Sequence, residues 1–93
     1  MAARALRLVI TGRVQGVGFR AWTCREARRH DLRGWVRNRS DGSVEALLIG
    51  EEAALEAMVA LSREGPRLAA VQEVHQHPAE DDGSAGFAER PTV

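Results

Sequence analysis

The sequence contains no lysine, no tyrosine, a single cysteine and no long apolar run. With Cys24 alone the chain cannot close an intramolecular disulfide, which excludes a stapled secreted miniprotein. One cysteine and three histidines also exclude a multi-thiolate metal site. No apolar run reaches the roughly 18–20 residues that cross a bilayer, and residues 1–10 have arginines in their apolar stretch and no signal-peptide cleavage site. We therefore expect a cytoplasmic protein without a membrane span.

The length of the chain limits it to one domain over residues 1–93, because domains usually contain roughly 100–200 residues. Surface scaling indicates that a chain of this size buries about 64% of its unfolded surface. That fraction is enough for one modest core without disulfides.

Charge is divided along the chain although the net charge is zero. The first 39 residues contain ten arginines and two acidic residues, a balance of +8, and the remainder has a balance of −8. This division indicates either a positive field that attracts an anion or two faces of one layer that neutralise each other. The sequence leaves both interpretations open.

Hydrophobic periodicity and turn residues predict the order βαββαβ with a short edge strand at the end. Expected strands cover residues 6–11, 32–38, 44–49, 70–77 and 87–90, and expected helices cover 19–30 and 51–62. Asp41-Gly42 predicts a tight hairpin turn because both residues tolerate positive φ. Residues 12–18 and the acidic segment 78–86 are expected to be loops. This order predicts an α+β, ferredoxin-like sandwich, an antiparallel sheet with both helices on one face.

A glycine-rich segment, residues 12–20, connects the first strand to the first helix. Backbone N–H groups in such a loop and at a helix start form an anion site, to which Arg20 adds a fork of donors. An arginine at a helix N-terminus is unfavourable unless an anion neutralises it. The alternative is that the glycines only shape a tight connection. A Walker A loop is excluded by the absence of lysine, and a dinucleotide fold does not fit in 93 residues.

Two segments together resemble a known family. Gly-Arg-Val-Gln-Gly-Val-Gly-Phe-Arg at residues 12–20 is followed by Gly-Trp-Val-Arg-Asn-Arg-Ser-Asp-Gly-Ser-Val at 34–44, and Gly50 closes the pattern. At this spacing the segments closely resemble the acylphosphatase family, over nearly the whole chain. The resemblance implies hydrolysis of acyl phosphates to a carboxylate and inorganic phosphate, with no metal or cofactor. It also implies a small-molecule substrate, and we expect a monomer that binds neither nucleic acid nor a membrane.

The resemblance also implies roles for individual residues. Arg20 would bind the phosphoryl group and Asn38 would position the attacking water. The loop backbone would cradle the phosphate oxygens at Gln15, Gly16, Val17, Gly18 and Phe19. An amide suits the role of Asn38 because it offers a donor and an acceptor without adding charge. The alternatives are a turn-initiating residue for Asn38 and a solvated helix-start arginine for Arg20.

Several other residues are expected to have structural roles. Cys24 and Met58 are expected to be buried, and Trp22 and Trp35 are expected to be packing residues. His75 and His77 share a strand face but lack a third metal ligand nearby, and His30 is expected at a helix end. The segment 87–91 is weakly apolar and contains a proline, so we expect a short last strand where the family usually has a clear apolar one.

Two other functions remain possible from the sequence. Ferredoxin-like sandwiches often bind RNA, and the basic first half fits that use, but RNA binding usually requires aromatic residues on the sheet and this chain has four aromatics in all. The second alternative is a non-catalytic accessory or anion-binding module of a larger assembly. The chain ends where the domain ends, which favours a free-standing enzyme.

Overall fold

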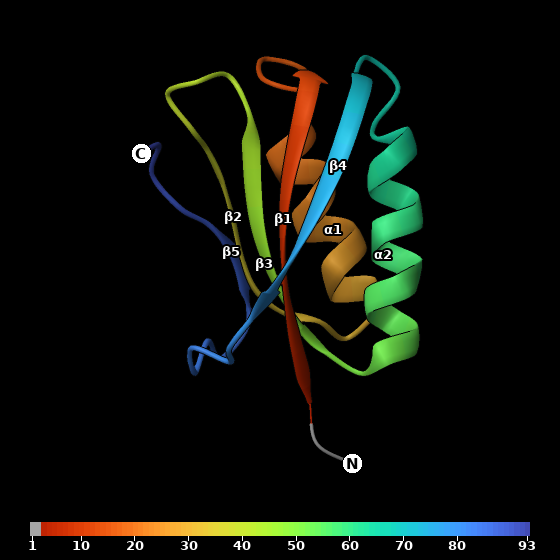
Figure 1. Ribbon diagram of the computed structural model, residues 1–93, viewed down its shortest axis with the longest axis vertical. Helices are drawn as coiled ribbons and strands as arrows, with labels where there is room; N and C mark the ends of the chain where they lie inside the picture. The colour runs from red at the N-terminus through yellow and green to blue at the C-terminus, as the bar shows by residue number, and fades with distance from the viewer. Residues whose placement is uncertain (1–2) are drawn as a thin grey trace.

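The computed structural model describes residues 3–93. Met1 and Ala2, which belong to the expected domain and to the segment tested for a signal peptide, lie outside the described residues. The strands are β1 (Arg4–Arg13), β2 (Arg33–Asn38), β3 (Val44–Gly50), β4 (Ala70–Ala79) and β5 (Phe87–Glu89), and the helices are α1 (Phe19–Arg29) and α2 (Glu52–Glu64). Figure 1 shows this arrangement. Neither helix within residues 3–93 has the length and apolar character that a membrane crossing requires.

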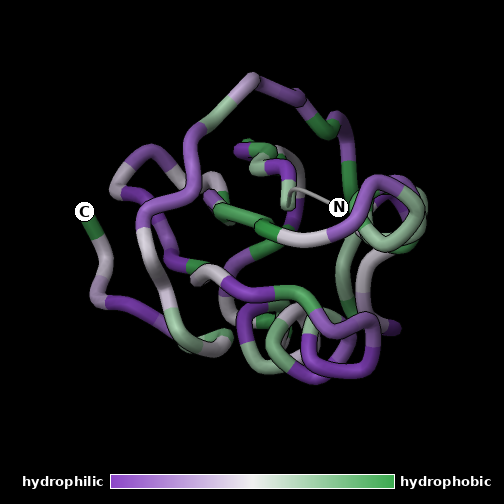
Figure 2. The backbone as a smooth tube through the Cα atoms, turned by 90° about the horizontal axis from the view of Figure 1, so that it is seen from below, coloured by the Kyte–Doolittle hydropathy of each residue, from purple (hydrophilic) through white to green (hydrophobic). Residues whose placement is uncertain are grey.

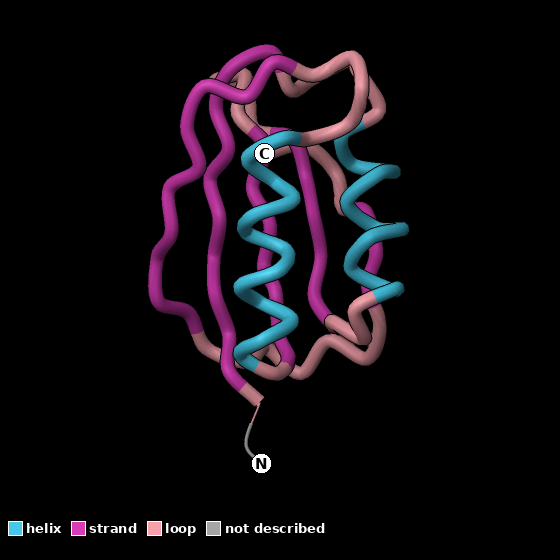
Figure 3. The backbone as a smooth tube through the Cα atoms, turned by 90° about the vertical axis from the view of Figure 1, so that its right-hand side faces the viewer, coloured by secondary structure: helices cyan, strands magenta, loops and turns pink. Residues whose placement is uncertain are grey.

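The five strands form one sheet in the order β4-β1-β3-β2-β5. The pairs β1–β3, β1–β4 and β2–β3 are antiparallel. Both helices run along the strands and pack on the sheet (Figure 3). The ferredoxin-like α+β fold is confirmed, with one correction: the sheet is mixed, because β5 joins the edge strand β2 in parallel.

The main core lies between the helices and one face of the sheet. Strand residues that alternate along the chain are fully buried there, including Leu8, Ile10 and Leu48. The helices contribute residues at helical spacing, such as Leu55 and Met58, and both helices mix hydrophilic and hydrophobic residues in Figure 2. The buried packing roles of Met58 and Cys24 are confirmed. Burial raises the pKa of the Cys24 thiol, so this cysteine is a packing residue and a poor nucleophile.

A smaller cluster covers the opposite face of the sheet, formed by Trp35, Leu47 and Ile49. The guanidinium carbons of Arg37 and Arg90 lie 4.4 Å and 5.2 Å from the centre of the Trp35 ring. Such contacts are cation–π interactions that cover the ring. Trp35 is therefore a packing residue, as predicted.

Strand β1 is longer than predicted at the end that leads to the glycine loop. It continues to Arg13, so Gly12 belongs to the strand and the loop contains residues 14–18. The pairing of β1 with β4 shifts register between Thr11 and Gly12, and a Cβ at Gly12 would collide with the carbonyl oxygen of Ala70. This glycine therefore permits close approach of two strands and is not a loop residue.

Strand β4 is also longer than predicted, because it includes Pro78, which was expected to begin the acidic loop. Pro78 is tolerated because β4 is an edge strand and a proline there leaves no ladder hydrogen bond unmade. At the other edge, β5 has only three residues, as expected for a short last strand, and its Phe87 is 4% exposed.

The turn between β2 and β3 differs from the predicted two-residue hairpin. Asn38 pairs with Val44, so the connection spans residues 39–43. Gly42 has a φ of 93°, whereas Asp41 does not adopt positive φ. The Asp41 carboxylate instead accepts hydrogen bonds from the hydroxyl and the backbone N–H of Ser43, at 2.6 Å and 2.9 Å, which lower its pKa. The side chain of Asp41 therefore shapes this turn.

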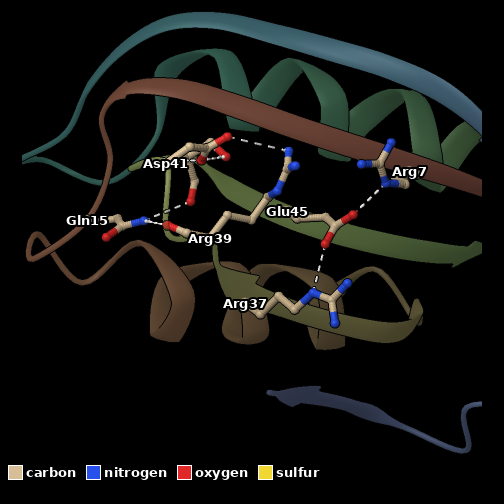
Figure 4. Close-up of polar contacts among 7 residues, drawn as sticks. Arg7, Gln15, Arg37, Arg39, Asp41 and Glu45 are labelled. Carbon is tan, nitrogen blue, oxygen red and sulfur yellow. Dashed lines mark hydrogen bonds and ion pairs between the residues drawn. The ribbon is translucent and has the colours of Figure 1, made fainter. Parts of the chain in front are cut away.

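Ion pairs connect the basic first half of the chain to the acidic second half. The clearest is Glu45, whose side chain is 6% exposed between Arg7 and Arg37 (Figure 4). Six of the first ten arginines lie within 4 Å of an acid from the second half: Arg4, Arg7, Arg20, Arg33, Arg37 and Arg39. This pattern favours mutual neutralisation over a free positive field.

Glu45→Gln should lower the free energy of unfolding at neutral pH by about 2 kcal/mol, because it leaves two arginines beside a buried site without their counter-charge. Burial by itself raises the pKa of Glu45, but hydrogen bonds from Arg7 and Arg37 and their charges lower it below its usual value. The stabilisation is therefore present above the unfolded-state pKa and is lost as the pH falls through the folded-state pKa. Thermal unfolding should show a Tm about 10 °C lower for the variant at pH 7, with the difference shrinking below about pH 4.

Glu56→Gln is the matched control for this prediction, because Glu56 is exposed and makes no ion pair within residues 3–93. It should change the Tm by less than about 2 °C. Equal effects of the two substitutions would show that the Glu45 ion pairs contribute nothing beyond net charge.

Candidate active site

The candidate site lies at the end of the sheet where β1 and β2 finish. Both strands are antiparallel to β3, which lies between them, so they run in the same direction. The loop 14–18 follows β1 and the turn 39–43 follows β2. Figure 1 shows both at one end of the sheet, with the start of β1 at the opposite end. The end of β2 therefore lies close to the glycine loop.

A pocket of about 130 Å³ lies between these segments. It is lined by Val14, Gly16, Gly18, Phe19, Arg20, Ala21, Asn38 and Glu89. Five of these residues were assigned to the site from the sequence: Gly16, Gly18, Phe19, Arg20 and Asn38. The pocket therefore brings the glycine loop, the start of α1, the end of β2 and strand β5 together.

The loop glycines give the pocket its backbone geometry. Gly16 and Gly18 have φ values of 72° and 80°, and a Cβ at either position would meet no atom within 4 Å. Glycine is therefore required there by the left-handed backbone and not by lack of space. Gly18 is also the N-cap of α1, and the first turn contains no acidic residue. The first N–H groups of a helix have no intrahelical acceptor and carry partial positive charge, so this end of α1 is suited to an anion.

Arg20 lies in the first turn of α1 and its side chain is 39% exposed. Its guanidinium makes no hydrogen bond with the described residues, and its Nε lies 3.8 Å from Oε1 of Glu89. The sequence indicated that an arginine here needs an anion to neutralise it, and the structure places the carboxylate of Glu89 near its guanidinium. Glu89 was not assigned to the site from the sequence. The only sequence signal for such a role was that an acidic residue stands in the weakly apolar segment 87–91.

Asn38 is the last residue of β2 and is partly buried. Its backbone carbonyl accepts a hydrogen bond from the N–H of Val93 at 3.2 Å. Its side-chain amide makes no hydrogen bond with any residue that the structure describes. The side-chain hydrogen bonds of the following turn are instead made by Asp41. The amide is thus left available to a ligand or water at the pocket.

Gln15 and Val17 were also assigned to the site, and neither side chain lines the pocket. The Gln15 side chain donates hydrogen bonds to the backbone oxygens of Arg39 and Ser43, at 2.8 Å and 2.9 Å (Figure 4). It therefore ties the glycine loop to the turn after Asn38. Val17 packs against the main core.

The histidines lie away from the pocket, and Glu89 is the one carboxylate among its lining residues. His75 and His77 are exposed on β4, and Nδ1 of His30 lies 2.8 Å from the backbone oxygen of Glu26 at the end of α1. Residues 3–93 contain no group of three or more His, Cys, Asp or Glu side chains that could hold a metal ion. The chemistry available at the pocket is therefore that of N–H groups, one guanidinium, one amide and one carboxylate.

Comparisons with known proteins agree on one family. A family model described as Acylphosphatase matches residues 6–88. The acylphosphatase of Acidiphilium cryptum (strain JF-5) is 48% identical over 88 residues, which cover 95% of this chain and 97% of that protein. The structure of an acylphosphatase from Coxiella burnetii has a TM-score of 0.91 at 31% identity, covering 96% of this chain and 94% of that chain. Full-length HypF in its phosphate- and nucleotide-bound form has a TM-score of 0.89 at 29% identity, covering 97% of this chain and 12% of HypF.

Proposed function

Because the chain belongs to the acylphosphatase family, hydrolases that cleave the carboxyl-phosphate bond of acyl phosphates, we propose that Arg20 and the loop backbone at residues 15–19 bind the phosphoryl group and that Asn38 positions the attacking water. The substrate is a small acyl phosphate, and the products are a carboxylate and inorganic phosphate. The observation that supports these roles is the pocket itself. It joins the start of α1, Arg20 and the unbonded amide of Asn38.

The proposed reaction requires little from the protein beyond positioning and charge stabilisation. The phosphoryl oxygens accept hydrogen bonds from the first-turn N–H groups and from Arg20. Asn38 holds a water in line with the phosphorus, the new P–O bond forms, and the bond to the acyl oxygen breaks. The carboxylate leaves with the bonding electron pair, and a phosphate oxygen takes the proton of the water. Since the leaving group is already good, preorganised donors are sufficient.

A non-catalytic binding module is the second candidate. RNA binding is disfavoured because the sheet offers no open aromatic surface within residues 3–93: its aromatic residues, Phe87 and Trp35, are 4% and 8% exposed. An accessory role is suggested by HypF, in which the matched fold forms a small part of a longer protein. The unengaged side chain of Asn38 at the pocket favours catalysis over either role. We also propose a monomeric, cytoplasmic, single-domain protein without nucleic-acid or membrane partners.

The mechanism predicts that kcat for benzoyl phosphate is nearly flat between about pH 5 and 8, because neither an arginine nor an amide titrates there. The assay is run with EDTA present, and activity should not depend on added divalent metal. A bell-shaped kcat profile with a midpoint near about pH 6.5 would implicate a histidine and contradict the scheme. Loss of activity in EDTA that is restored by a divalent metal would also contradict the scheme, because the proposed mechanism uses no metal ion.

A further inference from the structure

The pocket contains a carboxylate that the proposed mechanism does not use. Glu89 lies on β5, and it pairs in parallel with Val36, two residues before Asn38 on β2. It therefore lies on the strand adjacent to the end of β2 and lines the same pocket as Arg20 and Asn38.

Strand β5 is short, but its position is well fixed on both sides of Glu89. Phe87 is 4% exposed in the main core, and its backbone oxygen accepts a hydrogen bond from Nη2 of Arg28 at 2.7 Å. The N–H of Arg90 donates to the backbone oxygen of Val36 at 2.9 Å. The carboxylate of Glu89 is therefore carried by an anchored backbone, so its place in the pocket is a feature of the fold.

The ion pair between Glu89 and Arg20 is weak by itself. The Nε–Oε1 distance of 3.8 Å is too long for a hydrogen bond. The two side chains are 46% and 39% exposed, and ion pairs at such exposure contribute little. Orienting Arg20 is therefore a minor effect of Glu89.

Repulsion of a bound phosphate is the larger effect. A phosphoryl group held by Arg20 brings up to two negative charges close to a carboxylate of the same sign, and Coulomb energy scales with the product of the charges. The repulsion of a dianion is thus about twice the attraction between Glu89 and Arg20 at a similar distance. A ligand in the pocket also displaces screening water, which increases both the repulsion and the attraction.

Resting on the proposed role of Arg20, we propose that Glu89 is a specificity-determining residue that weakens the binding of doubly charged phosphate at this site. The residue lowers the affinity for the inorganic phosphate product and so favours its release. It also raises the KM of dianionic substrates. The favoured ligands are acyl phosphates whose phosphoryl group carries less negative charge.

The test compares Glu89→Gln with the native protein at about pH 7.5, where carboxylic acids are ionised. The inhibition constant of inorganic phosphate against benzoyl phosphate hydrolysis should fall about fivefold to tenfold in the variant. The KM for benzoyl phosphate should fall by a similar factor while kcat does not rise. Raising NaCl from about 0.02 M to about 0.5 M should shrink the difference, because salt screens the repulsion. An unchanged or higher inhibition constant would overturn the proposal.

Two variants separate charge from shape and from overall charge. Glu89→Asp keeps the carboxylate and should retain the native inhibition constant within about threefold. Glu80→Gln removes an exposed acid that makes no ion pair within residues 3–93 and does not line this pocket, and it should have no effect. If Glu89→Asp lowered the inhibition constant as much as Glu89→Gln, the negative charge of Glu89 would not be the cause. If Glu80→Gln lowered it as much as Glu89→Gln, the effect would not be local to the pocket.

Failure of this inference can be distinguished from failure of the proposed site. Phosphate affinity is also measured by amide chemical-shift titration, which does not depend on turnover. Arg20→Gln should abolish phosphate binding in both measurements. If Arg20→Gln bound phosphate normally, the proposed site would be wrong. If Arg20→Gln lost binding while Glu89→Gln left it unchanged, only the inference about Glu89 would fall.

Discussion

Arg20→Gln should lower kcat/KM for benzoyl phosphate by about 10³-fold or more. Arg20 is the only arginine that lines the pocket within the described chain, and its guanidinium makes no hydrogen bond there. Glutamine removes the positive charge and the planar pair of donors that match a phosphate group. Because the pocket also contains the carboxylate of Glu89, no positively charged side chain would remain to offset it. The loss should appear in both kcat and KM, since the phosphoryl group is bound in the ground state and in the transition state.

Two further variants make the result on Arg20 specific. Arg20→Lys keeps the charge but offers a single ammonium group, so it should recover part of the activity and remain about 10-fold to 10²-fold below the native enzyme. Arg25→Gln removes an exposed arginine from the same helix outside the pocket, and it should leave kcat/KM within about threefold. If Arg20→Gln were as active as Arg25→Gln, Arg20 would be a solvated helix-start residue and nothing more.

Much of the site could be predicted from the sequence because its parts follow from strand direction. A βαβ unit with an intervening antiparallel strand makes the first two strands end on the same side of the sheet. The loop after β1 and Asn38 at the end of β2 had to be neighbours for that reason alone. The start of α1 and the end of α2 could also be predicted locally, because Gly18 precedes the first helix and Gly65 follows the second. These features depend on residues that are close in sequence.

Apart from the turn at residues 39–43, the main errors concern contacts between residues that are distant in sequence. Gly12 looked like a loop residue, but its role is the close approach of β4, about sixty residues later. Glu89 could not be assigned to the pocket because its position depends on β5 pairing in parallel with β2. A three-residue strand with one buried aromatic carries no sequence signal for its direction or partner. The missed pocket residue and the mixed sheet therefore have the same cause.

The two interpretations of the charge division could be separated only by the structure. Most arginines of the first half are paired with acids of the second half, so the field they would create is largely cancelled. What remains for an anion is local to the pocket. There, the ion pair of Arg20 is weak, so its guanidinium can bind a ligand. The arginines around Glu45 are held by closer ion pairs and are not available in this way. Under the proposed function, anion binding therefore depends on one partly buried arginine, Arg20, and not on the overall charge of residues 1–39.

Asn38→Ala should lower kcat by about 10²-fold while KM changes less than about threefold. The proposed water is held by the amide only for the attack, so its loss raises the transition state more than it weakens substrate binding. The alternative role, initiating the turn at residues 39–43, predicts the opposite pattern: a lower Tm with normal turnover. The structure favours the first pattern, because Asp41 makes the side-chain hydrogen bonds of that turn and Gln15 braces it. Kinetics and thermal unfolding of the same variant measure both quantities.

Asn38→Asp and Ser40→Ala complete this test. Aspartate keeps the shape of asparagine but loses the donor and adds a second carboxylate beside Glu89, so it should be at least as inactive as alanine and should also raise KM. Ser40→Ala changes an exposed residue of the same turn whose hydroxyl makes no hydrogen bond within residues 3–93, and it should leave kcat and Tm unchanged. The backbone carbonyl of Asn38 accepts a hydrogen bond from the N–H of Val93, and the substitutions change side chains only, so we expect the strand end to stay in place. A large loss of kcat at an unchanged Tm therefore isolates the amide as the group that acts on the water, whereas a normal kcat in Asn38→Ala would remove it from the mechanism.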